Sequence, residues 1–519
     1  MVGVQTAGAR TAFSVASYEG SERSQNGVFL LLGVALAAFL AITLLVYSGA
    51  DGNLFAPTLI LTFVCLTPMI WRWPQLGVYL LLAAAVLVEH GPLRFGLSTT
   101  DQIPVFLNLD AVTGVPGLFL NPAEVLMLLT LGIWLLKQHQ SEGVTVRGGP
   151  LFLPFSFFMG IVLLGVLRGI IGGGDWNYTP NSVQALVFMY FTYLLTVNLV
   201  RSPGQVRVLL SILIGGVAIK GLIALWRYYV DLGADLTRID SMSGVNSLMA
   251  HSESFFFLAI LFLALVHLVY GGLGRQGRLS LAVLPVVIVP FLANQRRVGT
   301  AALLLALVVL LLLTYSLLRE RRRLVLGLLV IGALVVSLYG VASWNSGALV
   351  AEPVQAVKSG ISPDPQDRSS NDYREEEDAN LKFTALQNPL VGIGFGKPMI
   401  IHRPMPDLSD TWPRYTFEPH NGPLWLLMAT GVLGSLAFWY LMGTAIVRAV
   451  AAARQSQDQT CRSVVVFGLL TLVVFLVWAL FDMGLMNDRL GIFAGVQMGL
   501  MVMAPVLFGK QRLNEGGSA

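Results

Sequence analysis

Long uninterrupted apolar runs are the feature of this sequence that most limits its fold. The runs are about 17–25 residues long, which is the length of α-helix that crosses the hydrocarbon core of a bilayer. Of the 519 residues, 55% are hydrophobic and only 12% are charged, whereas soluble domains are typically about 25% charged. A soluble core cannot cover so much apolar surface. The sequence therefore predicts an all-α protein, a polytopic transmembrane helical bundle.

The apolar runs and their polar flanks predict about fourteen spans, with about 12–14 as the range because short paired runs are ambiguous. The spans are expected near residues 27–48, 55–70, 77–89, 121–136, 150–168, 183–200, 206–226, 247–271, 279–294, 298–318, 324–343, 421–447, 463–481 and 490–508.

Basic residues recur in alternate connections between these spans, most densely in the RERRR stretch at 319–323. By the positive-inside bias, this alternation predicts that both termini are cytoplasmic. The net charge of +4 is then explained by membrane insertion and does not indicate nucleic-acid binding. Cys65 and Cys461 fall at or near apolar segments and suggest neither a disulfide framework nor a metal site.

Residues 344–420 form the longest predicted connection, and the orientation puts it on the outer side. Connections of this length are commonly functional or disordered. Glycines at 392, 394 and 396 permit tight turns, and the stretch REEEDANLKFTAL is typical of a helix, so we expect an ordered outer subdomain. The predicted divisions are a cytoplasmic tail (1–26), an N-terminal transmembrane bundle (27–343), the loop subdomain (344–420), C-terminal transmembrane helices (421–508) and a cytoplasmic tail (509–519).

Arginines predicted on the outer side run against the insertion bias, which makes them candidates for function. They are Arg227, Arg238, Arg296, Arg297, Arg374, Arg403 and Arg414. The adjacent pair at 296 and 297 lies in a short hinge between two apolar runs. These two could snorkel from a helix end, or at least one could face a cavity and hold an anion, which forked guanidinium donors suit.

Two further positions have competing interpretations. Arg238 could be a loop arginine paired with Asp235 or Asp240, or it could bind an anion. Glu253, predicted about two turns into the next span, could be a buried partner or could face a water-filled cleft.

His420 ends the long connection one step before a span, with Glu418 shortly upstream and Asn421 following. A neutral imidazole can accept a proton from an attacking hydroxyl. A histidine at a helix start is also commonly a cap or an interface residue.

The sequence contains no metal-binding box, P-loop or nucleotide-binding glycine fingerprint, so neither a metal nor another cofactor is predicted. Outer arginines could instead hold a lipid-borne diphosphate.

Three segments together resemble the bacterial O-antigen ligase and polymerase family. They are NPLVGIGFG followed by HN at the head of a span, QRRVG opening an earlier span, and RIDSMSGVN, and the resemblance runs from about residue 205 to 500. It implies a glycosyltransferase of the inner membrane. Such an enzyme moves a glycan from an undecaprenyl-diphosphate carrier to a glycan or lipid acceptor on the outer face, without a cofactor. Ligase and polymerase differ in the acceptor, which the sequence does not decide.

Carried over residue by residue, the resemblance makes His420 the general base. It makes Arg238 and Arg297, or in place of the latter Arg296, the diphosphate-binding residues. The family usually has one arginine after a small residue where this chain has Asn-Gln-Arg-Arg, so the choice within the pair stays open. Candidate supporting residues are Glu418, Asn421, Glu253, Arg374 and Arg414.

The competing hypothesis is a polytopic transporter or flippase for a lipid-linked or anionic substrate. Transporters tend to carry internal repeats with broken helices near the membrane midplane. In this sequence the candidate charges gather on the outer side beside one long connection, and no two halves match. Glycan transfer is therefore the favoured hypothesis, with membrane lipids as partners and no nucleic acid.

Overall fold

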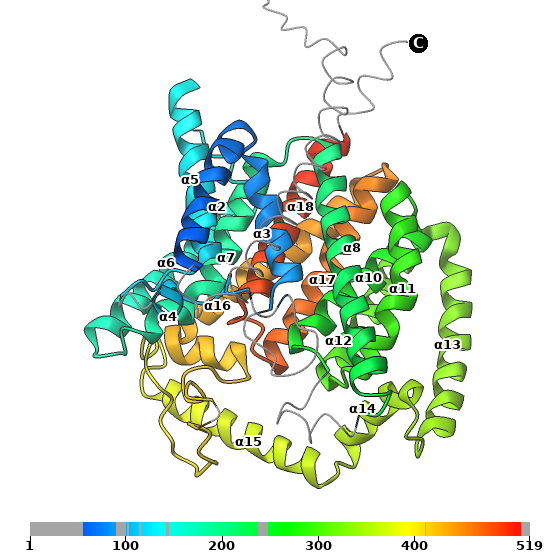
Figure 1. Cartoon of the computed structure of the whole chain (residues 1–519). Coiled ribbons are helices and arrows are strands. Elements are labelled where there is room, and N and C mark those ends of the chain that lie inside the picture. Colours follow the sequence, from blue (N-terminus) through cyan, green and yellow to red (C-terminus); the bar gives the residue numbers. More distant parts are fainter. Residues whose placement is uncertain are drawn as a thin grey trace, which may run out of the picture. The chain divides into compact units, whose positions relative to one another are not determined.

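The computed structural model of the chain describes residues 55–89, 100, 103–113, 117–141, 145–236, 248–410 and 412–509. The chain divides into residues 1–62, of which 55–62 are described, and a compact unit of residues 63–519. Throughout the described residues the regular elements are helices, with no β-strand, so the all-α prediction is confirmed (Figure 1).

The predicted span at 27–48 lies outside the described residues, and the other thirteen coincide with α-helices. These are α2 (Phe55–Arg72), α3 (Gln75–Leu87), α5 (Pro122–Ser141), α6 (Phe152–Ile171), α7 (Tyr178–Leu199), α8 (Pro203–Trp226), α10 (His251–Tyr270), α11 (Gly274–Ala293), α12 (Arg297–Leu317), α13 (Arg322–Ser343), α16 (Gly422–Gln455), α17 (Gln459–Phe481) and α18 (Asp488–Gly509). Within the described ranges, ten helices are long and apolar enough to cross a membrane. A multi-pass membrane protein is therefore confirmed.

The core of the bundle forms around α18, which packs against α7, α17 and α3. Glycines recur every fourth residue along one face of α18, at 491, 495 and 499. A Cβ atom there would approach Ala185 O, Thr192 Oγ1 and Thr196 Cβ of α7 to 2.3, 2.1 and 2.6 Å. Small residues at this spacing let two transmembrane backbones approach closely, where dispersion forces and hydrogen bonds replace the hydrophobic effect. The glycine row thus fixes α18 against α7.

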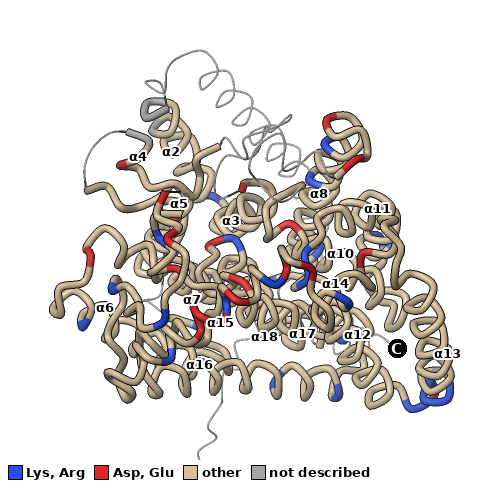
Figure 2. The backbone as a smooth tube through the Cα atoms, turned by 90° about the horizontal axis from the view of Figure 1, so that it is seen from below, with Lys and Arg blue, Asp and Glu red and all other residues tan. Residues whose placement is uncertain are grey.

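The described part of residues 344–420 contains two α-helices, α14 (Glu352–Ile361) and α15 (Pro365–Leu386), after a short 3-10 helix at Leu349–Ala351. The stretch REEEDANLKFTAL lies within α15, so its helical character is confirmed. Asp364 caps α15 by accepting a 2.7 Å hydrogen bond from Asp367 N, and proline follows at the first helical position. Figure 1 shows α15 lying across the ends of upright helices, and Figure 2 shows acidic and basic residues together around α14 and α15.

One face of α15 is buried although the helix is polar. Glu377, Asn380, Leu381 and Thr384 recur at helical spacing and are each 0% exposed. The Asn380 amide oxygen accepts hydrogen bonds from the backbone N–H groups of residues 402 and 403 at 2.8 and 2.7 Å, and Thr384 Oγ1 accepts one from Ile400 N at 2.8 Å. This face therefore binds the following loop through polar groups.

The segment 388–396, NPLVGIGFG, passes between α6 and a break in α16. Gly431 has a φ of 66° inside α16, and the segment supplies partners around that break: Ile393 N donates to Met428 O at 2.8 Å and Val432 N donates to Pro389 O at 2.8 Å. Glycines 392, 394 and 396 all have positive φ. A Cβ at Gly394 would lie 2.3 Å from Gly169 N. The glycines are therefore required both for their conformation and for close contact.

Candidate active site

His420 lies at the junction of the 344–420 segment and α16. Its backbone N–H donates to Glu377 Oε2 at 2.9 Å, and its Nδ1 lies 3.2 Å from both carboxylate oxygens of that residue. Glu377 is 0% exposed, while the side chain of His420 is 19% exposed. A carboxylate only accepts hydrogen bonds, so we assign the proton of the neutral ring to Nδ1. This leaves Nε2 as an acceptor, the state that a general base requires.

Aromatic rings restrict the orientation of this imidazole further. The rings of Tyr373 and Trp412 meet His420 edge-on, with centroids 6.0 and 5.4 Å away. Tyr373 comes from α15, one turn before Glu377. Burial, followed by the nearby Glu377 carboxylate, raises the pKa of the Tyr373 phenol above its ordinary value, which keeps it neutral. The imidazole is thus fixed by one carboxylate and two rings.

A cavity of about 500 Å³ opens beside His420. Its lining includes charged groups of both signs, namely Arg374, Lys382, Arg403, Glu375, Glu377 and Asp378. Asn421, the N-cap of α16, accepts from Leu424 N at 3.1 Å and donates to Asp378 Oδ2 at 3.3 Å. The start of a helix carries a partial positive charge, which favours an anion nearby. The cavity therefore combines a base with cationic groups.

Next to this cavity lies a second histidine–carboxylate pair. His251, the first residue of α10, has its Nδ1 3.0 Å from Asp482 Oδ2, and Asp482 directly follows α17. Burial alone would raise the pKa of Asp482, but the facing His251, the Met483 N–H and His420 hold it well below the ordinary value. Asp482 is therefore an anion at neutral pH. Its electrostatic interactions with both histidines show that the two pairs are neighbours.

The structure distinguishes Arg296 from Arg297. Arg297 Nη1 lies 3.1 Å from Asn371 Oδ1 and 3.4 Å from Asp367 Oδ1, so its guanidinium holds the start of α15. Arg296 interacts electrostatically with Asp482 and Arg374, and its buried Nε has no hydrogen-bond partner among the described residues. Burial lowers the pKa of Arg296 to about 10, which still leaves it cationic at neutral pH. Arg296 therefore keeps a buried donor without a described partner, whereas Arg297 uses its Nη1 to hold α15.

The other candidates fall in different places. Arg238 lies outside the described residues. Arg374 and Asn421 share the cavity with His420. Arg414 Nη1 pairs with Glu418 Oε1 at 3.2 Å and lines a different cavity beside α7.

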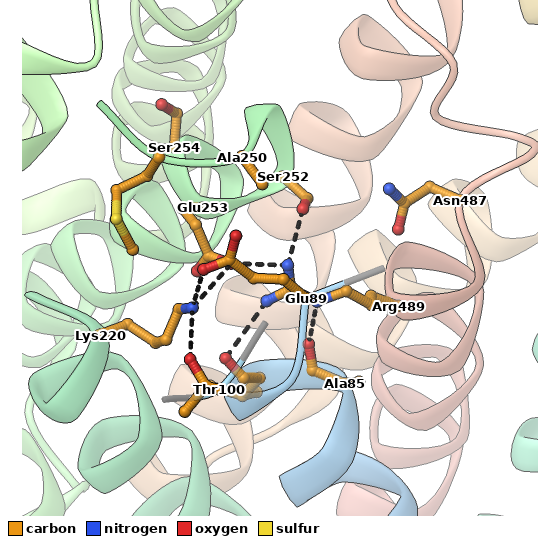
Figure 3. Close-up of polar contacts among 12 residues, drawn as sticks. Ala85, Glu89, Thr100, Lys220, Ala250, Ser252, Glu253, Ser254, Asn487 and Arg489 are labelled. Atoms are coloured by element: carbon orange, nitrogen blue, oxygen red, sulfur yellow. Dashed lines mark hydrogen bonds and ion pairs between the residues drawn. The ribbon is translucent and has the colours of Figure 1, made fainter. Parts of the chain in front are cut away.

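Glu253 belongs to a buried charge cluster inside the bundle (Figure 3). Its Oε1 lies 2.5 Å from Arg489 Nη1 of α18 and 3.6 Å from Lys220 Nζ of α8, and Lys220 also pairs with Glu89. All four side chains are at most 1% exposed. Because α10 begins at residue 251 rather than 247, Glu253 lies in the first turn of its helix. Glu253 is therefore a buried ion-pair partner, here of Arg489 and Lys220, and does not face a water-filled cleft.

The family model of the O-antigen ligases matches residues 281–439. These residues form an O-antigen ligase domain. The match confirms the resemblance found in the sequence, and over these residues it supports a membrane glycosyltransferase family of the O-antigen ligase type. A comparison with curated proteins gave no match.

The O-antigen ligase domain extends from α11 into α16 and contains His420, Glu377 and both hinge arginines. His251 and Asp482 lie outside it, yet they interact with His420 and Arg296. The ligase domain and the flanking helices thus build the candidate site together.

Sequence reasoning missed several of these residues. Glu377 lies in the acidic run of a predicted helix and is not among the predicted site residues, although a helical wheel places it on the same face as Asn380 and Thr384. His251 and Asp482 are also not among the predicted site residues, and Asp482 directly follows the predicted span 463–481. Lys220 carried a usable signal, because it lies within the predicted span 206–226 and charges within apolar runs are costly in a membrane, whereas Arg489 lies just before the predicted span 490–508.

Proposed function

We propose that the protein is a glycosyltransferase of the cytoplasmic membrane that moves a glycan from an undecaprenyl-diphosphate carrier to an acceptor hydroxyl on the extracytoplasmic side. The proposal rests chiefly on one observation: His420 is held through Nδ1 by buried Glu377 at the edge of a cavity of about 500 Å³ that is also lined by cations. A base beside cations suits a reaction in which a hydroxyl loses its proton while a diphosphate departs.

In the proposed mechanism, Nε2 of His420 accepts the proton of the acceptor hydroxyl. The hydroxyl oxygen attacks the anomeric carbon, and the bond from that carbon to the diphosphate oxygen breaks, with inversion. The electron pair leaves with undecaprenyl diphosphate. Glu377 stabilises the imidazolium that forms.

Arg296 and Arg374 are proposed to stabilise the departing diphosphate, with Arg238 as a further candidate from outside the described residues. The forked donors of a guanidinium match two phosphate oxygens at once. Removing one such stabilising contact from a transition state commonly costs about 3–4 kcal/mol.

The test is transfer by the purified, full-length protein in nanodiscs that contain the lipid-linked glycan and an acceptor. His420→Ala is expected to lower the turnover number by roughly 10²–10⁴-fold, the usual contribution of a general base. His402→Ala is the matched control, because His402 stacks on Phe383 at 4.2 Å and does not line the cavity. Near-normal transfer by His420→Ala would refute the assignment of the base.

Deleting the gene distinguishes glycan transfer from transport, and it also distinguishes a ligase from a polymerase. Accumulation of undecaprenyl-linked long chains is expected for a ligase, and accumulation of undecaprenyl-linked single repeats for a polymerase. If neither species accumulates on the extracytoplasmic side, a transporter or flippase becomes the better explanation.

A further inference from the structure

A second cavity, of about 460 Å³, lies beside the N-terminal part of α7 and is separate from the one at His420. Its polar lining consists mainly of side-chain amides: Asn108, Asn177, Asn181 and Gln184, together with Asp110 and Arg414. Phe106 and Phe119 supply apolar surface in the same wall. The cavity therefore offers many neutral groups that both donate and accept hydrogen bonds.

The amides are ordered by contacts among themselves. Asn108 Nδ2 lies 2.9 Å from one amide atom of Asn181, and Gln184 Nε2 lies 3.4 Å from Asn108 Oδ1 and 3.2 Å from Glu124 Oε2. Asn181 and Gln184 come from successive turns of α7, whereas Asn108 directly precedes the short helix α4 (Leu109–Thr113). Preorganised polar groups lose little conformational entropy when they bind a ligand.

The charge of the cavity argues against an anionic ligand. Arg414 is paired with Glu418 at 3.2 Å, its guanidinium lies over the Tyr178 ring at 5.1 Å, and it lies 2.9 Å from the other amide atom of Asn181. Asp110 adds a negative charge to the lining. No surplus positive charge remains in the described lining to hold a phosphate. The cavity at His420 differs in being lined by six charged side chains, the cations Arg374, Lys382 and Arg403 and the carboxylates Glu375, Glu377 and Asp378.

Building on the proposed function, we infer that this amide-lined cavity binds a neutral, hydroxyl-rich segment of a glycan. Each sugar hydroxyl both donates and accepts a hydrogen bond, which matches the amide groups, and the apolar faces of sugar rings match the two phenylalanines. Arg414 and His420 are six residues apart, hence at most about 20 Å along the chain. An oligosaccharide can therefore occupy this cavity while its end reaches the base.

The experiment measures binding of the glycan released from the producing strain's lipid carrier by mild acid, which carries neither lipid nor diphosphate. The full-length protein in nanodiscs is titrated with this glycan by calorimetry. Asn181→Ala and Gln184→Ala are each expected to weaken binding about tenfold or more, since each removes hydrogen bonds to the ligand. Asn177→Ala, an exposed side chain whose truncation leaves the helix packing intact, is expected to weaken binding as well.

Two controls separate this inference from the proposed function. Asn345→Ala, an exposed residue outside both cavities, and His420→Ala should bind the released glycan like the unaltered protein. If the glycan does not bind to the unaltered protein, or binds to Asn177→Ala and Asn181→Ala as tightly as to the unaltered protein, the inference is wrong. If the amide variants lose binding but the unaltered protein transfers no glycan, the proposed function fails and the glycan site stands.

Transfer kinetics identify which glycan occupies the cavity. In Asn181→Ala, a KM raised about tenfold for the lipid-linked donor assigns the cavity to the donor glycan, and a KM raised for the acceptor assigns it to the acceptor glycan. An unchanged KM for both substrates contradicts the inference.

Discussion

At the scale of single residues, the candidate site is a set of groups that constrain one another. Glu377 accepts from both the backbone N–H and Nδ1 of His420 and is itself fully buried. A carboxylate in that place fixes the tautomer and stabilises the imidazolium formed when the base takes a proton. The spacing in sequence, 43 residues, explains why the pair was not predicted.

Glu377→Gln tests this role. The amide can still fill the space but no longer stabilises an imidazolium, so we expect the turnover number to fall by roughly 10²–10⁴-fold. The neighbouring Glu376→Gln, whose carboxylate lies 3.7 Å from Arg403 and is 35% exposed, should stay within a few-fold of the unaltered enzyme. Both are measured by glycan transfer in nanodiscs. Equal turnover by Glu377→Gln and the unaltered protein would mean that His420 does not act with this carboxylate.

Substitutions of the two hinge arginines, Arg296 and Arg297, should have different effects on glycan transfer and on stability. Arg296→Ala is expected to reduce transfer by about 10²–10³-fold, because it removes a guanidinium whose buried Nε has no partner among the described residues. Arg297→Ala is expected to reduce transfer less than tenfold and to lower the unfolding temperature, because Arg297 contacts Asn371 and Asp367 of α15. Transfer kinetics and thermal unfolding of both variants measure this. The reverse ranking would assign the diphosphate to Arg297.

At the scale of elements, the polar helix α15 and the glycine segment 388–396 position the site against the transmembrane helices. The spans themselves were predictable, because only an uninterrupted helix satisfies its own backbone in lipid and so leaves a long apolar run in the sequence. The helical character of α15 was also predictable. Which of the carboxylates in its EEED run faces inward depends on the loop at 399–405 and on His420, which no local pattern reveals.

The glycine segment gives a prediction at this scale. Gly394 has a φ of 95°, and a Cβ there would lie 2.3 Å from Gly169 N and 2.5 Å from Gly169 Cα. Gly394→Ala should therefore destabilise the protein by at least about 2 kcal/mol, from backbone strain and from the forced separation of α6. Gly340→Ala in α13 meets no atom within 4 Å and should be neutral or stabilising by up to about 1 kcal/mol. Chemical unfolding in detergent compares them, and equal stability would contradict the tight contact.

At the scale of the whole bundle, the buried charges join segments that are distant in sequence. Lys220 of α8 pairs with Glu89, which follows α3, and donates to Thr100 Oγ1 at 3.1 Å. Arg489 of α18 donates to Ala85 O at 2.7 Å and to Ser252 Oγ at 2.9 Å. Two cations and two carboxylates compensate one another. Sequence alone could flag such charges within apolar runs but could not pair them, because the partners come from four different segments.

Because these charges compensate one another, the losses of stability caused by the single substitutions should not add up in the double variant. Lys220→Met leaves Glu89 as a buried anion without its partner, and Glu89→Gln leaves the cluster with an extra positive charge. Each should destabilise the protein by about 3–5 kcal/mol, the usual cost of breaking a buried pair. The double variant restores neutrality while Glu253 keeps Arg489 at 2.5 Å, so its loss should be well below the sum of the two single losses.

Chemical unfolding of the four proteins in the same detergent measures the coupling between Lys220 and Glu89, and transfer by the folded fraction shows whether the cluster also affects turnover. If the cluster only holds α3, α8, α10 and α18 together, the double variant should transfer glycan at a normal rate once folded. Among the described residues, no hydrogen bond or ion pair joins the cluster to His420, and the charges of the cluster are compensated within the bundle. Additive losses of stability would show that Lys220 and Glu89 are solvated independently, and the charge-compensated core would then be the wrong description.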